Sequence, residues 1–184
     1  DSGRYVELWN LVFIQYFRDK TGTLNDLPAT HVDTGAGLER FCRVQQGVES
    51  NYETDLFQPI ITEIAERSGI AYELNGIHIP HRVIADHVRA LSFAIADGGM
   101  MGNEGRGYVL RRIMRRAIRY GRNLGLKRPF LHDTARVVFD IMAPAYPELK
   151  EASAFITNVI ENEEVRFSET LDNGLRVLND ALED

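Results

Sequence analysis

The segment from Arg106 to Arg128 constrains the fold of this chain more than any other part of its sequence. It contains nine basic residues, and no carboxylate occurs between Glu104 and Asp133. At about 100° per residue, its central arginines fall within an arc of about 140° on a helix. They are Arg111, Arg112, Arg115, Arg116, Arg119 and Arg122. Most of the remaining arc is apolar: Val109, Leu110, Ile113, Met114, Ala117, Ile118, Tyr120 and Leu124. The pattern predicts a helix with one face in a core and one guanidinium face.

The charge of this segment sets it apart from the rest of the chain. The formal net charge is −6, and subtracting the +9 of this segment leaves −15 elsewhere. Arginines four residues apart, such as Arg111 and Arg115, repel one another and destabilise a helix by a few tenths of a kcal/mol. The planar guanidinium group suits phosphates and base edges. The segment is therefore typical of a surface that binds a polyanion.

Two other interpretations of the basic face stay open. Carboxylates of the acidic C-terminal helix could pair with some of the arginines, which would make the face a structural network. A basic amphipathic helix can also lie on a membrane, but this apolar arc contains neither Trp nor Phe. No stretch approaches the roughly 20 apolar residues that span a bilayer. We therefore expect no membrane partner.

The whole sequence predicts an α+β fold that is mostly α. Aromatic and β-branched residues favour a strand over Tyr5–Phe17, and a short extended piece is expected at His31–Asp33. Residues 20–23 and 25–28 are typical of turn and loop. Because a strand near the start needs neighbours to pair with, we suspect a piece of a larger protein. Helices are expected at 38–46, 56–67, 82–96, 107–124, 130–143 and 149–182, the last as one long helix or a bent pair. Residues 70–80 are expected to be irregular, with a domain boundary near residue 50.

A glycine-rich turn, Asp33-Thr34-Gly35-Ala36-Gly37-Leu38-Glu39-Arg40, joins the short extended piece to the first expected helix. Glycines let the backbone approach a ligand, and a helix start offers free N–H groups to an anion. Arg40 could clamp a phosphate and Asp33 could hold an ammonium group. The turn is neither a Walker nor a Rossmann fingerprint. It could also be a plain tight turn in which Arg40 pairs with a carboxylate.

Other reactive side chains give weaker signals. Cys42 is the only cysteine and cannot form an internal disulfide, so a reducing, cytoplasmic compartment is expected. His78 and His81 have near-metal spacing, but the proline between them and the lack of a second ligand pair favour loop histidines. Met100 and Met101 are interpreted as packing or loop residues. No spacing supports a Ser/His/Asp arrangement.

Several segments together resemble the alanyl-tRNA synthetases, and the resemblance runs across essentially the whole chain. They are Arg4–Phe13, Val32–Arg40, Arg82–Arg89 and Asn103–Ala117, the last being the most specific. The run Gly-x-Gly-x-Glu-Arg resembles the third signature motif of class II synthetases. The resemblance implies that residues 1–48 are the C-terminal part of a class II catalytic domain. It implies that residues 52–184 form a helical domain that recognises the tRNA acceptor stem.

The resemblance also implies a pocket for small substrates. The residues for alanine would be Trp9, Asn10, Asp33 and Gly35, and those for ATP would be Gly35, Gly37 and Arg40. Within this set, Asp33 would bind the amino group of alanine and Asn10 would lie near its carboxylate. Arg40 would be the catalytic residue, since it would hold the ATP phosphates.

An RNA contact is implied in the same way. Asn103 matches the asparagine that reads the G·U wobble pair marking alanine tRNA. The second reader in the family is an aspartate on the last helix. Asn179 stands at the matching place here, with Asp180 adjacent, so either could take that role. The implied tRNA-binding residues are Asn103, Arg106, Arg111, Arg112, Arg115, Arg116, Arg119, Asn179 and Asp180.

The implied function is that of a ligase that activates alanine with ATP and Mg²⁺ and transfers it to the 3′ end of alanine tRNA. The first two signature motifs, a zinc-bearing editing domain and a C-terminal oligomerisation segment would lie outside this chain. The chain alone is therefore expected to be monomeric, to bind no metal and to be catalytically inactive. The alternative is a non-catalytic RNA-binding helical module, in which the glycine-rich turn is purely structural.

Overall fold

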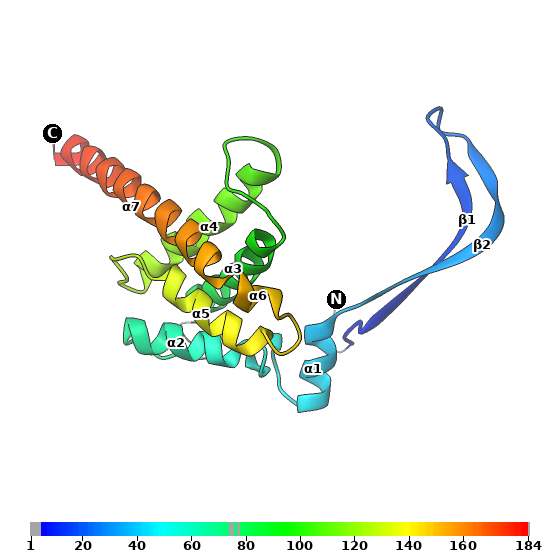
Figure 1. Cartoon of the computed structure of the whole chain (residues 1–184), viewed down its shortest axis with the longest axis horizontal. Helices are drawn as coiled ribbons and strands as arrows, with labels where there is room; N and C mark the ends of the chain where they lie inside the picture. The colour runs from blue at the N-terminus through cyan, green and yellow to red at the C-terminus, as the bar shows by residue number, and fades with distance from the viewer. Residues whose placement is uncertain (1–4, 74–75, 77, 184) are drawn as a thin grey trace. The chain divides into compact units, whose positions relative to one another are not determined.

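The computed structural model describes residues 5–73, 76 and 78–183. The chain forms two compact units, unit 1 over residues 1–54 and unit 2 over residues 55–184 (Figure 1). The boundary predicted between residues 48 and 52 falls shortly before this division. Arg4, the first residue of the first motif, lies outside the described residues. So do residues 74, 75 and 77 of the segment expected to be irregular.

An antiparallel hairpin forms most of unit 1. Strand β1 (Trp9–Arg18) pairs with strand β2 (Leu24–Ala36). In the turn between them, Asp19 Oδ1 accepts hydrogen bonds from the backbone N–H groups of Thr21 and Thr23 at 2.8 and 3.0 Å. The strand predicted over Tyr5–Phe17 is therefore confirmed from Trp9 onward, and the turn predicted at 20–23 is confirmed as well.

Strand β2 is much longer than the sequence predicts. The loop expected at residues 25–28 is wrong, because these residues belong to β2. The ladder is irregular there: Ile14 pairs with His31, whereas Tyr16 pairs with Asp26. Pro28 lies in this interruption and has no N–H to donate, and proline in a sheet is confined to edges and bulges. The bulge lets the strand continue through a proline that locally resembles a loop.

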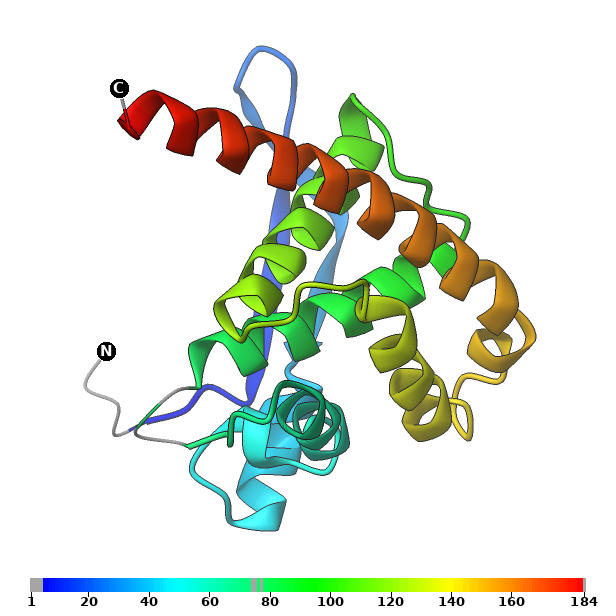
Figure 2. The ribbon, with the colours of Figure 1, turned by 90° about the vertical axis from the view of Figure 1, so that its left-hand side faces the viewer.

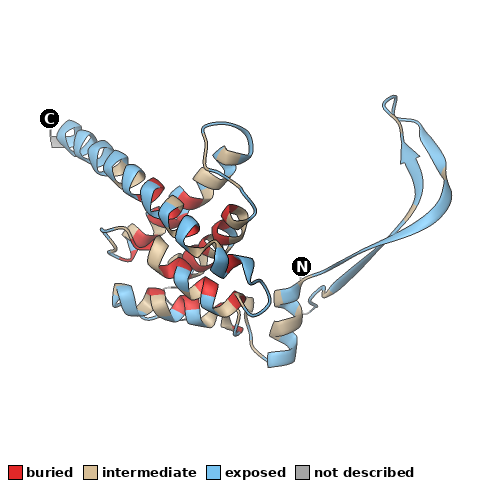
Figure 3. Cartoon of the chain, in the orientation of Figure 1, coloured by how far each residue is buried: buried red, intermediate tan, exposed pale blue. Residues whose placement is uncertain are grey.

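The hairpin exposes apolar side chains along its length. Trp9, Phe13 and Phe17 are 62%, 73% and 59% exposed, and none of the described hairpin residues is buried (Figure 3). An isolated two-stranded hairpin is marginally stable in water. This agrees with the expectation that the first strand needs further partners.

Two helical segments complete unit 1. Helix α1 (Leu38–Gln46) has the predicted bounds and ends at Gly47, which has a left-handed φ of 67°. The short 3₁₀ helix η1 (Asn51–Glu53) follows, and a capping box stabilises its N-terminus. The Ser50 side chain accepts a hydrogen bond from a backbone N–H of the helix, and the Glu53 side chain accepts one from the backbone N–H of Ser50. These caps fix where the chain leaves the hairpin and turns toward residue 54.

The described residues of unit 2 form six helices (Figure 2). They are α2 (Gln58–Ser68), α3 (Ile79–Ala96), α4 (Gly105–Asn123), α5 (Leu131–Met142), α6 (Glu148–Glu151) and α7 (Ser153–Glu183). Helix α3 is central, since it contacts each of the other five. Its apolar face, including Ile84, Leu91 and Ile95, is completely buried. The predicted mostly helical α+β fold is confirmed.

The helix bounds differ from the predictions in two notable places. Helix α3 begins at Ile79 rather than at residue 82, so the interpretation of His81 as a loop histidine is wrong: it is a buried residue of α3. Of the two arrangements expected over 149–182, one long helix or a bent pair, the structure has two helices, but they are very unequal: the short α6 ends just before Ala152 and the long α7 follows it. Ile156 and Ile160 of α7 are buried in the core, whereas Leu178 and Leu182 near its end are 53% and 75% exposed. None of the described helices is long and apolar enough to cross a membrane.

A buried carboxylate joins α7 to α5. Glu164, only 1% exposed, accepts hydrogen bonds from the backbone N–H groups of Phe130 and Leu131, both at 3.0 Å. The start of α5 has no cap from its own side chains, so α7 supplies one. Burial raises the pKa of the Glu164 carboxyl to about 7, with smaller contributions from the charges of Asp133 and Glu161.

The stability of unit 2 is expected to depend on pH through Glu164. The folded carboxyl keeps its proton up to about pH 7, whereas an ordinary Glu loses it near 4.5. The free energy of unfolding should therefore fall by up to about 3 kcal/mol as the pH rises between these values. Glu164→Gln, which cannot ionise, should remove this dependence in denaturant titrations at about pH 5 and pH 7.5. Glu169→Gln, an exposed site on the same helix, is the control. An unchanged pH dependence in Glu164→Gln would refute the assignment.

Candidate functional site

The hairpin places Asn10 and Asp33 on the same face. Asn10 pairs with Gly35, and Val12 pairs with Asp33. Opposite residues share a face, as do residues two apart along a strand. Asn10 and Asp33 are therefore diagonal neighbours, about 7–8 Å apart at their Cα atoms. Gly35, directly opposite Asn10, adds no side chain, so the two polar groups border an open space.

Trp9 does not join this pair on the hairpin. It is opposite Ala36 and directly precedes Asn10 in β1. Because successive side chains of a strand project to opposite faces, the indole lies on the face away from Asn10 and Asp33. The structure thus brings together three of the four residues expected to surround alanine.

Arg40 lies in the first turn of α1 and contacts the chain before β1. Its Nη1 donates to the carbonyl oxygen of Glu7 at 2.9 Å and lies 3.8 Å from Glu7 Oε1. A Cβ on Gly37 would lie 3.1 Å from Arg40 Cδ, so glycine at this position leaves room for the arginine to fold back. The Arg40 side chain is 48% exposed and the Glu7 side chain 64%. An exposed pair at this distance is weak, so the guanidinium remains available to an anionic ligand.

In unit 2, α4 buries one face and exposes arginines on the other, as predicted. Met114, Ala117 and Ile118 are buried. One prediction needs correction: Val109, assigned to the core face, is 54% exposed. Val109 lies nearer the start of α4 than Met114, which is the first buried residue of the helix. This first part of α4 extends beyond the packed core, so the Val109 side chain stays exposed.

Two arginines of α4 pair with α7. Arg111 Nε lies 2.6 Å from Glu163 Oε1, and Arg111 Nη2 donates to Glu163 Oε2 at 3.2 Å. Arg122 Nη2 lies 3.1 Å from Asp172 Oδ1. Among the described residues, no carboxylate forms an ion pair with the exposed arginines Arg112, Arg115, Arg116 and Arg119. The arginine–carboxylate network considered as an alternative therefore accounts for only part of the basic face.

The four exposed arginines lie over aromatic rings instead. The guanidinium carbons of Arg112, Arg115, Arg116 and Arg119 lie 6.0, 4.9, 5.8 and 5.7 Å from the ring centroids of Tyr108, Phe167, Tyr120 and Tyr120. A ring face attracts the cation and restrains it without using its N–H groups as a carboxylate would. We define these four side chains as the arginine face. Its N–H groups remain available to phosphate or base acceptors.

Asn103 lies in the loop that leads into α4, beside Arg111, the residue that precedes the first member of the arginine face. Its side chain is exposed, and Asn103 Oδ1 accepts a hydrogen bond from Arg111 Nη1. A guanidinium can only donate, so the amide must turn its oxygen toward Arg111 and its NH₂ group away. Arg106, also an expected RNA contact, is exposed in the first turn of α4.

Gly107 holds the Asn103 loop against α4. A Cβ on Gly107 would lie 2.7 Å from the carbonyl oxygen of Met100 and 2.8 Å from the backbone nitrogen of Gly102. Both distances are too short for real contacts, so the loop can pack this closely only against glycine. The position of Asn103 beside Arg111 therefore depends on the close contact between this loop and Gly107.

Replacing Gly107 by alanine is expected to displace the Asn103 loop while unit 2 stays folded. The new methyl group must push the backbone of residues 100–102 away, at a cost of about 1–3 kcal/mol. Gly102→Ala is the matched control, because a Cβ there meets nothing closer than 3.7 Å. Amide hydrogen exchange over residues 99–104 measures the effect. Equal exchange in the two variants would show that Gly107 does not hold the loop.

Asn179 and Asp180 lie far from Asn103. Both are exposed near the end of α7, where Asp180 forms an exposed ion pair with Arg176 at 3.7 Å. Helix α7 meets Arg111 at Glu163, and Asn179 follows about 24 Å further along the helix axis. The structure therefore does not bring either residue beside Asn103.

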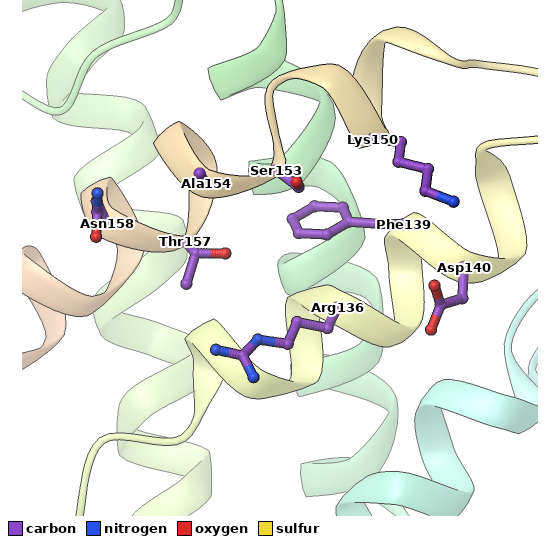
Figure 4. A pocket seen from close by; sticks show the side chains of 8 residues that line it. All are labelled: Arg136, Phe139, Asp140, Lys150, Ser153, Ala154, Thr157 and Asn158. Atoms are coloured by element: carbon purple, nitrogen blue, oxygen red, sulfur yellow. The ribbon is translucent and has the colours of Figure 1, made fainter.

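Two pockets of unit 2 differ in whether they adjoin these sites. One, of about 550 Å³, lies among α5, α6 and α7 and contains none of the predicted site residues. Figure 4 shows the Phe139 ring in its centre, with Lys150 and Asp140 on one side and Arg136 on the other. The second, of about 200 Å³, lies beside the Arg111–Glu163 ion pair and includes Met100, Met101, Val159, Asn162 and Arg166. Only the second pocket adjoins a predicted site.

Comparison with known proteins shows the family to which the whole chain belongs. The family model described as tRNA synthetases class II (A) matches residues 1–184. The chain belongs to this family. It is 59% identical to an alanine–tRNA ligase of Desulfosudis oleivorans over 184 residues and 56% identical to one of Nitrosospira multiformis over 182 residues. It is 49% identical to one of Staphylococcus epidermidis over 185 residues.

These matches cover 99–100% of the chain but 21% of each relative. The chain thus spans about a fifth of the length of the curated relatives that it matches. The resemblance to class II synthetases inferred from the motifs is confirmed at the level of the family.

The structure of this class II synthetase chain adds two residues that the sequence analysis missed. Glu163 anchors Arg111, and Phe167 lies under Arg115. Arg111 and Arg115 are four residues apart on α4, and Glu163 and Phe167 are four residues apart on α7. Side chains at this spacing lie on the same face of a helix. That shared spacing is a signal, but it becomes specific only once α4 and α7 are known to pack together.

Proposed function

We propose that this chain is part of an alanine–tRNA ligase and that its helical unit binds the acceptor stem of alanine tRNA. The observation that carries the proposal is the arginine face of α4 beside the exposed amide of Asn103. Four guanidinium groups that pair with no carboxylate in the described part of the chain form a surface that an RNA backbone would neutralise. The names of the matched relatives support the choice of alanine tRNA.

The structure of an RNA helix fits separate roles for the arginine face and for Asn103. The minor groove of A-form RNA is wide and shallow and displays 2′-hydroxyls and base edges. Asn103 can reach such an edge from its loop, while the arginines of α4 hold phosphates of the adjoining backbone. Phosphate contacts position the RNA, and the base contact specifies it. We therefore assign affinity to the arginine face and discrimination of the G·U pair to Asn103.

In unit 1, we propose a share of the alanine and ATP pocket. The Asp33 carboxylate can pair with the ammonium group of alanine, and the Asn10 amide can hydrogen-bond its carboxylate. Gly35 leaves space between them. Arg40 and the N–H groups at the start of α1, beyond Gly37, can bind the phosphates of ATP and stabilise charge during transfer.

Mg²⁺ accompanies ATP in class II synthetases, and the described residues do not form a dedicated site for it. They contain no cluster of three or more His, Cys, Asp or Glu side chains that could hold a metal ion. Mg²⁺ is usually held by substrate phosphates and only one or two carboxylates. Mg²⁺ would therefore be held mainly by the phosphates of ATP.

Binding of an acceptor-stem minihelix as a function of salt tests the RNA assignment. The observed association constant should fall steeply with salt, with a log–log slope of about −0.9 per phosphate contacted if the stem behaves like duplex DNA. A basic face with a purely structural role predicts no binding at any salt concentration. Fluorescence anisotropy with a labelled minihelix distinguishes the two outcomes.

A further inference from the structure

Three side chains form a continuous series of hydrogen bonds, which we call the relay: Glu163 on α7, Arg111 on α4 and Asn103 in the loop before α4. Glu163 engages Arg111 through two nitrogen atoms, with Nε 2.6 Å from Oε1 and Nη2 3.2 Å from Oε2. The remaining terminal nitrogen, Nη1, donates to Asn103 Oδ1. The side chains of the ion pair are only 17% and 10% exposed, whereas Asn103 is exposed. A largely buried pair thus holds one solvent-facing amide.

This geometry fixes the chemistry that Asn103 presents. The carboxylate holds the guanidinium group by one hydrogen bond, from Nη2, and by its close contact with Nε. These two contacts restrict the orientation of the guanidinium plane, so the direction of Nη1 is set from α7. Because Nη1 can only donate, Asn103 must direct its NH₂ group outward. Without Glu163, Arg111 could turn toward the solvent or toward phosphate, and the amide could rotate to present either its oxygen or its nitrogen.

We propose that Glu163 is a positioning residue for RNA recognition, which acts through Arg111 to present the NH₂ group of Asn103 to a base-edge acceptor in the minor groove. This inference rests on the proposed function, since it specifies how the same site recognises its RNA. Glu163 itself touches no RNA. It determines which hydrogen-bonding group Asn103 offers and where that group lies.

Orientation matters because G·U and G·C pairs both present a pyrimidine O2 acceptor in the minor groove. The wobble geometry displaces uracil relative to guanine, so the acceptor occupies a different position in the two pairs. A donor that is free to move can follow either acceptor, whereas a fixed donor can favour one. Loss of the relay should therefore reduce discrimination more than affinity.

A second ion pair between the same helices provides a matched control. Arg122 and Asp172 also join α4 to α7, at 3.1 Å. Among the described residues, Arg122 donates to Asp172 and to no loop amide. Asp172→Ala removes a link between the two helices and leaves the relay intact. A structural effect of losing an ion pair should therefore appear in both variants, and an effect on discrimination only in Glu163→Ala.

The experiment measures the binding of G·U and G·C minihelices by the unmodified chain, Glu163→Ala, Glu163→Gln, Asp172→Ala, Asn103→Ala and the Asn103→Ala/Glu163→Ala double variant. We expect Glu163→Ala to reduce the G·U preference by about tenfold or more, and Asp172→Ala to preserve it. Glu163→Gln keeps one acceptor oxygen for Arg111 and should retain part of the preference. In the Asn103→Ala background, loss of Glu163 should change the preference no further, since the two act as one unit.

Three results would overturn or separate the assignments. If Glu163→Ala keeps the G·U preference, or weakens both stems equally, Glu163 has no positioning role. If the double variant loses more preference than Asn103→Ala, Glu163 acts by a route other than Asn103. If the unmodified chain has no G·U preference, the proposed function itself is wrong. Thermal unfolding of each variant shows whether it is folded, and Glu163→Gln carries the test should Glu163→Ala unfold.

Discussion

A variant without the arginine face is expected to bind an acceptor-stem minihelix about a hundredfold or more weakly at about 50 mM salt. This variant carries the substitutions Arg112→Gln, Arg115→Gln, Arg116→Gln and Arg119→Gln. Each phosphate contact removed should also reduce the slope of log K against log salt by about 0.9, if the stem behaves like duplex DNA. G·U and G·C stems should be affected equally, because phosphate contacts carry no sequence information.

A control of equal charge change separates this surface from the net charge of the protein. Arg18, Lys20, Arg136 and Arg176 are exposed basic residues outside α4. Their replacement by glutamine alters the net charge by the same amount and should weaken minihelix binding by less than about tenfold. If both variants lose affinity equally, binding depends on overall charge and the arginine face has no special role.

Arg40→Ala in the full-length ligase is expected to reduce kcat/KM for ATP–pyrophosphate exchange by about 100- to 1000-fold. That is the usual effect of removing one group that stabilises transition-state charge. Asp33→Asn should act mainly through a higher KM for alanine, since it removes the charge that pairs with the ammonium group. Steady-state exchange assays at varied ATP and alanine concentrations separate these two effects.

Arg43→Ala is the matched control for Arg40→Ala. Arg43 lies on the same helix, near its end, and is not part of the proposed pocket, so exchange activity should be preserved. If Arg40→Ala and Asp33→Asn both leave exchange and aminoacylation intact, the glycine-rich turn is purely structural. The chain would then be a non-catalytic RNA-binding module.

The sequence predicted most helices because their apolar periodicity and end signals agree. Helix α1 has the predicted bounds, and α4 follows from the opposite arcs of arginine and apolar residues. It did not predict the length of β2, since Pro28 locally favours a loop. Only the bulge opposite β1 shows how the strand accommodates it. Strand pairing is non-local, so local propensity alone cannot reveal it.

The site was predictable in part for the same reason. Asn103 and the arginines lie close together in the sequence, and a helical period is enough to group them. Glu163 and Glu164 are adjacent acidic residues, and from the sequence alone such a pair is typical of an exposed helix face. Packing gives them distinct roles: one holds Arg111 and the other caps α5. Periodicity also places Asn179 on the last helix, but only the structure shows how far along α7 it lies from Asn103.

The most direct test of the RNA assignment compares G·U and G·C minihelices with the unmodified chain and with Asn103→Ala, at two salt concentrations. The unmodified chain should prefer the G·U stem at both. Asn103→Ala should lose this preference while keeping the salt dependence that the arginine face confers. Equal weakening of both stems by Asn103→Ala, with the preference unchanged, would contradict the role of Asn103 as the base reader.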